Sequence, residues 1–406
     1  MTSVLQCLVN LIPVQNYFLR DVRHNTDSCI FLRRANEQSN RSNSTEEMPC
    51  NLSCLACEFD KLMLSYYGRC VGIDISKSIN SRKSDDLLSR EFSCQEPSSV
   101  ECGLPLTASD FIVSTWRMGE MRHLAGHDQH DAHEFLQALL DKLNEDCKKM
   151  EQTIISVKRR SNTSKFLSQN KENNESIRVK TVISSFQGFL KSVLVCQQCG
   201  EKRSQNEPFV NISLPINRKA THHQNNYHDA MYRQRLSKLI DIRNCLDHFT
   251  EEESLSDLLH CEWCKEPTSM LKQHTFSKLP TILCLHLKRF DAATNKKIDD
   301  PVSFPAVLDM GSYLPHWREV EQTSVLKTPD TDACDNTQPL ILYDLCGTIN
   351  HSGGMNQGHY VANVKIEDAW YNCNDAHVRA LSSVDEVLKN NEVYMIFYTR
   401  RNLTLS

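Results

Sequence analysis

Apolar and polar positions alternate with two different periods along the chain, and this divides it into two halves. Residues 127–148 carry apolar side chains every three or four positions, which predicts an amphipathic helix with one buried face. That face consists of Phe135, Leu136, Leu139, Leu140 and Leu143. Asp131 and Glu134 fall near the N-terminal end, where the helix dipole favours negative charge.

The first residues of the chain show the same helical spacing. Within residues 1 to about 35, the apolar positions are Val4, Leu5, Leu8, Val9 and Ile12. Because proline lacks a backbone N–H and clashes with the preceding turn, Pro13 is expected to stop this helix.

The period changes to two in the second half. Val210, Ile212, Leu214 and Ile216 alternate with polar residues, which predicts a half-buried strand. The stretch "LPTILCLHLKRF" (279–290) is apolar on both faces up to its Lys-Arg end and predicts a central strand. Short strands are also expected in "LILYDLCGTINHSG", "HYVANVK", "AWYNCND" and "VYMIFYTRR". Helices followed by strands indicate an α+β fold with an antiparallel sheet.

Polar segments separate these elements. Residues 36–49 and 320–338 are expected to be loops, and residues 151–180 and 217–236 disordered insertions, because they offer few apolar side chains to bury.

Composition narrows the class of protein. The chain has 406 residues, of which 40% are hydrophobic and 24% charged, with a formal net charge of −5. This describes a globular protein of one large domain or two modest ones, with no charge excess favouring nucleic acid or a membrane surface. We expect no transmembrane helix, because no run of about 18 apolar residues occurs. The N-terminus also lacks the basic region and cleavage site of a signal peptide.

The 18 cysteines favour metal binding over disulfides, since six of them form three Cys-x-x-Cys pairs in a chain without an export signal. Cys196 and Cys199, with Cys261 and Cys264, have the spacing of two thiolate pairs that share one tetrahedral Zn²⁺. The pairs lie far apart in sequence, so the metal would clamp the tips of a long hairpin. Four sulfur ligands make such a site structural. The alternative is a coincidence of buried or redox-active cysteines.

A second metal site has weaker spacing. His24, Cys29, Cys54 and Cys57 could supply one imidazole and three thiolates, with Cys50 as a rival ligand. Loose surface thiols are the alternative explanation.

A candidate catalytic histidine begins the stretch "GHYVANVKIEDAWYNCNDAHV". His359 follows a glycine-containing loop, "NHSGGMNQG", and Asn374 and Asp375 return at the end of the next predicted strand. Either could orient the imidazole so that its other nitrogen accepts a proton. The nucleophile would be serine or cysteine. A histidine at a strand end is more often an ordinary surface or core residue, and that alternative stays open on these residues alone.

Several motifs together resemble the ubiquitin-specific protease family of cysteine deubiquitinases. They are "HLAGHDQHDAHEFLQALLDKL", "FQGFLKSVLVCQQCG", "LPTILCLHLKRF", "VSFP", "GHYVANV" and "WYNCNDA", in this order. Within the family, "STWRMGEMRHLAGHDQHDAHEFL", "WYNCNDA" and the His24, Cys29, Cys54, Cys57 set are most similar to the branch containing the histone-deubiquitinating subunit of the SAGA coactivator.

The resemblance implies a papain-like thumb, palm and fingers fold. A single domain would span 1–402, with a thumb at 1–150, zinc-stapled fingers at 181–216 and 250–275, and a palm at 276–402. It also implies that a cysteine thiolate attacks the carbonyl after the ubiquitin tail, with His359 as general base and Asn374, followed by Asp375, as the orienting position. Implied partners are ubiquitin, ubiquitinated proteins such as histones, and coactivator subunits, with a nuclear location.

The family's nucleophile is not found in the chain. It stands in a Gly-Asn-Thr-Cys stretch followed by an aromatic residue, methionine and a helix that matches Met1, Ser3, Val4, Leu5, Gln6 and Leu8. The cysteine would therefore precede Met1 by two residues, and Cys7, inside the helix, is expected to pack in the core. Three interpretations remain: an active deubiquitinase whose sequence begins late, a ubiquitin-binding pseudo-enzyme, or a zinc-stapled scaffold that is similar only in structure.

Overall fold

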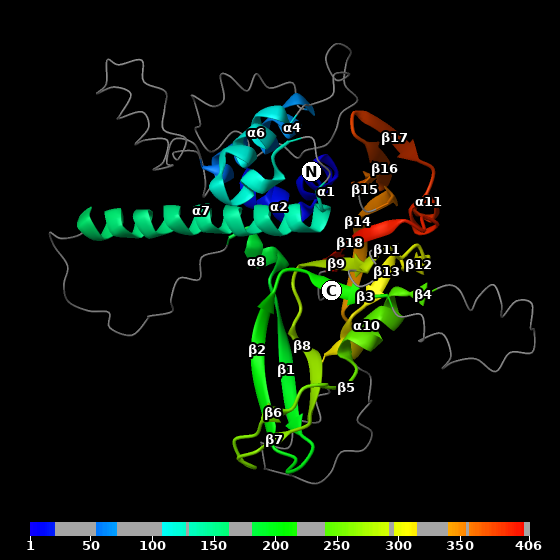
Figure 1. Ribbon diagram of the computed structural model, residues 1–406. Coiled ribbons are helices and arrows are strands. Elements are labelled where there is room, and N and C mark those ends of the chain that lie inside the picture. The colour runs from blue at the N-terminus through cyan, green and yellow to red at the C-terminus, as the bar shows by residue number, and fades with distance from the viewer. Residues whose placement is uncertain are drawn as a thin grey trace, which may run out of the picture. The chain divides into compact units, whose positions relative to one another are not determined.

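The computed structural model describes residues 1–20, 54–70, 108–126, 130–161, 181–216, 240–291, 296–314, 340–354 and 357–401 (Figure 1). Its contacts divide the chain into two compact units, Met1–Ser184 and Ser185–Ser406. The first unit is helical where it is described and the second is built mainly of strands, as the change of period predicts. The finer division into thumb, fingers and palm stays a prediction.

The helices of the first unit are α1 (Thr2–Val9), α2 (Ile12–Gln15), the π-helix η1 (Asn16–Arg20), α4 (Leu55–Cys70), α6 (Ser109–Arg117), the 3-10 helix η2 (Gly119–Leu124) and α7 (Ala132–Ser161). A short helix, α8 (Ile183–Phe186), spans the boundary between the units.

The core of the first unit confirms both predicted apolar faces, with two corrections. All five predicted residues of the α7 face are at most 1% exposed, and Val4, Leu5 and Leu8 of α1 are buried. Ile12, by contrast, is 64% exposed. Helix α1 already ends at Val9, and Pro13 lies in the first turn of α2, where its missing N–H has no intrahelical acceptor to lose.

Helix α7 begins later and ends much later than predicted. It starts at Ala132 and continues to Ser161, so it runs into the predicted insertion at 151–180. Its middle also organises a neighbouring helix, because Asp146 is 2% exposed and accepts a hydrogen bond from the Leu55 backbone N–H at 2.8 Å. That N–H is one of the unpaired donors at the start of α4, so Asp146 caps α4 from another helix.

The second unit contains one large sheet with the order β17-β16-β15-β14-β18-β9-β3, and β13 pairs with β14. Its strands are β3 (Ile212–Pro215), β9 (Ile282–Lys288), β13 (Val307–Asp309), β14 (Leu342–Gly353), β15 (Gly358–Ile366), β16 (Ala369–Asn374), β17 (His377–Leu381) and β18 (Val393–Arg400). Smaller elements of this unit are β4 (Ile240–Asp241), α10 (Ile242–Thr250), β10 (Phe290–Asp291), β11 (Lys296–Lys297), β12 (Val302–Ser303), the 3-10 helix η4 (Gly311–Tyr313) and α11 (Val384–Leu388).

The sheet confirms the period-two segments. Ile212 and Leu214 are buried in β3, and β9 is buried on both faces from Ile282 to Leu287. The large sheet is antiparallel as predicted, except that β3 pairs with β9 in parallel. The separate pair of β4 and β12 is also parallel. Arg289, just after β9, is 1% exposed and donates hydrogen bonds to four backbone carbonyls. These acceptors belong to Val393, Ile298, Asp300 and Asn391.

A separate, elongated sheet has the order β2-β1-β8-β5. It consists of β1 (Gly188–Cys196), β2 (Lys202–Phe209), β5 (Glu253–Ser254) and β8 (Met270–Lys278), and the β6 (Leu259–His260) and β7 (Pro267–Thr268) hairpin lies at its far end (Figure 1). Every residue of β2 up to Pro208 is exposed, so this sheet has little core of its own. None of the described helices is both long and apolar enough to cross a membrane.

Candidate functional site

His359 and Asn374 form a close pair at the ends of two adjacent strands. His359 is the second residue of β15 and Asn374 is the last residue of β16, and these strands pair antiparallel. The Nε2 atom of His359 lies 2.6 Å from Oδ1 of Asn374. Because an amide oxygen only accepts, Nε2 must carry the hydrogen and Nδ1 is left as the proton acceptor. The His359 side chain is 46% exposed, so solutes can reach the ring.

Asp375 lies farther from the imidazole. Its Oδ2 is 4.0 Å from His359 Nε2, and its side chain is 64% exposed. It has a φ of +49° at the turn between Asn374 and His377, which are paired across β16 and β17. At 4.0 Å this carboxylate oxygen is beyond hydrogen-bond distance of Nε2, so Asn374 is the group placed to orient the ring. The sequence alone allows either residue to orient the imidazole.

Behind Asn374, a row of polar side chains ties three strands together. Asn372 Nδ2 donates to Asn363 Oδ1 at 2.8 Å, and Asn363 Nδ2 donates to Thr348 Oγ1 at 3.1 Å. Asn372 and Asn374 face the same side because strand side chains alternate. The row therefore anchors the strand that carries Asn374. Only the spacing of two between Asn372 and Asn374 is visible in the sequence; the contacts with Asn363 and Thr348 depend on how the three strands pair.

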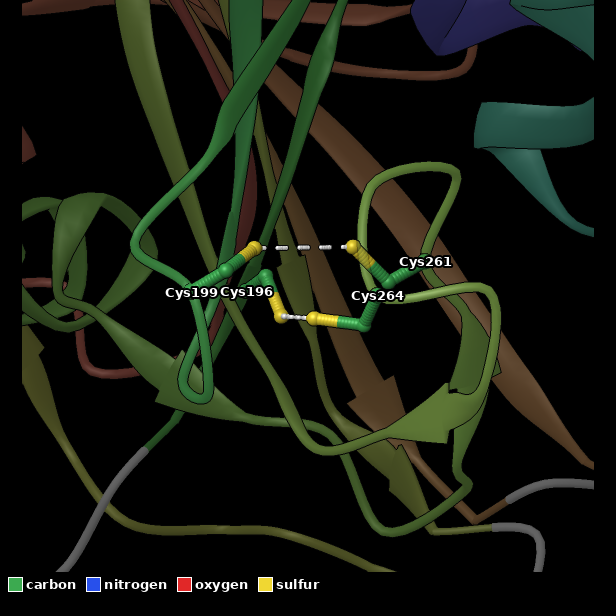
Figure 2. A group of neighbouring side chains, drawn as sticks. All are labelled: Cys196, Cys199, Cys261 and Cys264. Carbon is green, nitrogen blue, oxygen red and sulfur yellow. Dashed lines mark hydrogen bonds between the residues drawn. The ribbon is translucent and has the colours of Figure 1, made fainter.

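The four predicted zinc-binding cysteines lie together at the tip of the elongated sheet (Figure 2). All four Sγ atoms lie within 4.8 Å of one another. Cys196 Sγ is 3.8 Å from Cys264 Sγ, and Cys199 Sγ is 3.7 Å from Cys261 Sγ. Four sulfurs bound tetrahedrally to Zn²⁺ at about 2.3 Å would be about 3.8 Å apart. The residues therefore fit a metal ion, and the spacing is that of ligands rather than of a disulfide.

Both cysteine pairs have the same local backbone. Cys196 N–H donates to Glu201 O and Gly200 N–H to Cys196 O, and the same two bonds recur between Cys261 and Glu266 and between Lys265 and Cys261. The residue after the second cysteine has a positive φ in each case, +75° at Gly200 and +60° at Lys265. Two equivalent turns thus aim four sulfurs at one point.

The environment of these thiols favours a bound cation. The Thr268 hydroxyl, 3.3 Å from the sulfur, lowers the pKa of Cys196 to about 6. The neighbouring Cys199 thiol, followed by desolvation, raises the pKa of Cys264. Without a cation these crowded sulfurs cannot all ionise, and a divalent ion would stabilise all four thiolates.

The backbone at Lys265 gives a first testable prediction. We expect Lys265→Gly to stabilise the metal-loaded tip of the elongated sheet by up to about 1 kcal/mol, because glycine adopts a positive φ without steric cost. Gly200→Ala is the matched control and should destabilise the other turn by roughly 1 kcal/mol, since its added Cβ would contact nothing and only backbone strain acts. Denaturant unfolding of the two variants would measure both effects. Shifts of the same sign in the two variants would contradict this account.

The second predicted metal set is only half visible. Cys54 and Cys57 are 1% and 0% exposed, so they are not loose surface thiols. His24, Cys29 and the rival Cys50 lie outside the described residues. Cys7 is 1% exposed inside α1, as expected for a core residue.

Comparison with known proteins agrees with these features. The sequence model of the ubiquitin carboxyl-terminal hydrolase family matches residues 1–398. Ubiquitin carboxyl-terminal hydrolase 8 of Saccharomyces cerevisiae is 28% identical over 99% of the chain, and the chain spans 69% of that protein. Ubiquitin carboxyl-terminal hydrolase 22 of Homo sapiens is 32% identical over 70% of the chain, which spans 51% of it.

A solved structure of the SAGA DUB module bound to monoubiquitin matches 99% of the chain with a TM-score of 0.61 and 24% identity, and the chain spans 66% of that structure's chain. At this identity the match establishes the fold, which is α+β as predicted. The family match rests on nearly the whole chain. The chain therefore belongs to the ubiquitin carboxyl-terminal hydrolase family, close to the relatives of the SAGA branch.

Proposed function

We propose that the chain is the histidine-bearing catalytic region of a thiol-dependent deubiquitinase, which hydrolyses the bond after the C-terminal glycine of ubiquitin. The observation that carries this proposal is the hydrogen bond of 2.6 Å between His359 Nε2 and Asn374 Oδ1. It leaves Nδ1 unprotonated on a half-exposed ring, as a general base requires. Membership of the hydrolase family supports the assignment of the reaction.

In the proposed reaction, Nδ1 of His359 accepts the proton of a cysteine thiol. The sulfur bonds to the carbonyl carbon, and the carbon–nitrogen bond then breaks as the imidazolium returns the proton to the leaving amine. Water then attacks the resulting thioester as the same nitrogen accepts its proton. The carbon–sulfur bond breaks to release the ubiquitin carboxylate, and the imidazolium returns the proton to the cysteine sulfur. Asn374 holds the ring throughout, although an amide stabilises the imidazolium less than a carboxylate would.

We propose that the nucleophile is not among residues 1–406. Among the described residues of the first unit, Cys7, Cys54, Cys57 and Cys147 are all buried. The Cys147 sulfur also accepts a hydrogen bond from the Tyr17 hydroxyl at 3.1 Å. The resemblance of α1 to the helix that follows the family's nucleophilic cysteine supports this proposal. Residues 1–406 alone should then bind ubiquitin without cleaving it.

Zinc and partners complete the proposal. Cys196, Cys199, Cys261 and Cys264 would hold a structural Zn²⁺ that ties the two turns together. A second site with His24, Cys29, Cys54 and Cys57 remains part of the proposal. The SAGA DUB module structures, which contain Sgf11, Sus1 and Sgf73, support ubiquitin and coactivator-complex subunits as partners. A nuclear role on ubiquitinated proteins such as histones is the further part of the proposal that the family resemblance implies.

Titration of residues 1–406 with fluorescently labelled ubiquitin tests the proposal directly. We expect saturable binding in the micromolar range, typical of transient recognition, and no turnover of a ubiquitin C-terminal fluorogenic amide. Ubiquitin that lacks its two C-terminal glycines is the matched control and should bind more weakly. No binding at high micromolar ubiquitin would contradict the proposed function.

A further inference from the structure

Gly358, directly before His359, lies against a buried side chain of the neighbouring strand. A Cβ atom added at Gly358 would be 2.0 Å from Nε2 of His351 and 2.8 Å from the backbone oxygen of Ser352. Its φ is not in the positive region, so the need for glycine comes from close packing and not from backbone conformation. The edge of the His351 ring therefore sets how near β15 can approach β14 at this point.

His351 itself is fixed from several sides. It is 3% exposed, and its ring centroid lies 4.6 Å from that of Tyr360 and 5.5 Å from that of Phe290. Its backbone N–H donates to the backbone oxygen of Glu392 at 2.9 Å. Closely packed aromatic rings and a paired backbone leave the imidazole little freedom to move.

A lysine fastens the same end of β14. Lys297 Nζ donates to the His351 oxygen at 2.8 Å and to the Gly353 oxygen at 3.0 Å, and its side chain is only 8% exposed. Gly353 pairs with Gly358 across the two strands, and Ser352 pairs with His359. Lys297 therefore holds the backbone on both sides of Ser352, the residue that pairs with His359.

From this packing we propose that His351 is a positioning residue for His359. Its ring supports the backbone of Gly358, and this fixes the start of β15 so that His359 Nε2 meets Asn374 Oδ1 at 2.6 Å. A hydrogen bond this short tolerates little displacement. The consequence for catalysis rests on the proposed function, whereas the positioning itself does not.

The test measures the tautomer of His359 in the chain labelled with ¹⁵N-histidine, at a pH where histidine side chains are neutral. In the native chain the two ring nitrogens should give the well-separated shifts of a single tautomer, assigned by their loss in His359→Ala. In Gly358→Ala the two shifts should converge, because the displaced ring loses its Asn374 partner. Gly354→Ala is the matched control: a Cβ there has nothing within 4 Å, so the shifts should stay separate.

A compensating variant distinguishes positioning from general damage. In Gly358→Ala combined with His351→Ala, the space vacated by the ring should restore part of the separation, with the Ser352 oxygen limiting the recovery. Unchanged shifts in Gly358→Ala or in His351→Ala would overturn the proposal. If circular dichroism shows that Gly358→Ala does not fold, His351→Ala alone decides: convergence supports the proposal, and unchanged shifts refute it. Ubiquitin binding is measured separately, so failure of the proposed function is recognised independently.

Discussion

Adding Gly-Asn-Thr-Cys-Phe before Met1 is expected to turn a chain that we propose binds ubiquitin without cleaving it into one that hydrolyses a ubiquitin C-terminal fluorogenic amide. The added cysteine would stand just before α1, which begins at Thr2. A helix N-terminus lowers the pKa of a thiol, and in the proposed mechanism the imidazole of His359 takes up the thiol proton, so the thiolate becomes available near neutral pH. Steady-state turnover of the amide by the extended and native chains measures the gain.

Matched variants of the extended chain separate the roles of the catalytic groups. The same extension with serine in place of cysteine should be inactive. His359→Ala should lower kcat/KM by about 10²–10⁴-fold, the usual contribution of a general base. Asn374→Ala should have a smaller effect, and Asn374→Asp should retain activity because a carboxylate also accepts from Nε2. Turnover that survives His359→Ala would refute the proposed mechanism.

The His359–Asn374 pair could be foreseen because strand geometry is regular. In an antiparallel hairpin, the first residues of one strand lie beside the last residues of the other. Strands β15 and β16 form such a pair, so His359 at the start of β15 lies near Asn374 at the end of β16. The sequence does not show which of Asn374 and Asp375 is the partner of the imidazole; the distances in the structure do. Asn374 is the last strand residue and shares a face with Asn372, whereas Asp375 already has the positive φ of the turn.

Other features depend on contacts that no local pattern records. The polar composition of residues 151–161 suggested an insertion, yet α7 continues to Ser161. Nothing in the sequence around Gly358 or His351 indicates that these two residues pack closely against each other. The capping of α4 by Asp146 likewise joins two helices far apart in the chain. Such contacts are set by the tertiary fold, which propensity and period do not determine.

Removal of the metal is expected to unfold the tip of the elongated sheet while leaving the His359–Asn374 pair in place. Strand β2 is almost wholly exposed. Among the described residues, the buried cluster at the four cysteines consists of Cys196, Cys261 and Met270, with Leu194, Leu255 and Cys264 partly buried against it. A bound metal would therefore supply much of the local folding free energy; structural zinc in small peptides contributes about 10–16 kcal/mol. Hydrogen exchange with and without a chelator would show lost protection in 188–209 and 259–278 and retained protection in β14, β15 and β16.

Cys264→Ser should reproduce the effect of the chelator and lower the bound zinc by one ion per chain, since a hydroxyl is a far poorer zinc ligand than a thiolate. Cys346→Ser is the matched control. Its sulfur donates to the Phe397 oxygen and accepts from Thr399, and a hydroxyl can make both hydrogen bonds. Zinc content and exchange at the tip should then be unchanged. Equal zinc loss in both variants, or a tip that stays protected after chelation, would show that this part of the fold does not depend on the four sulfurs.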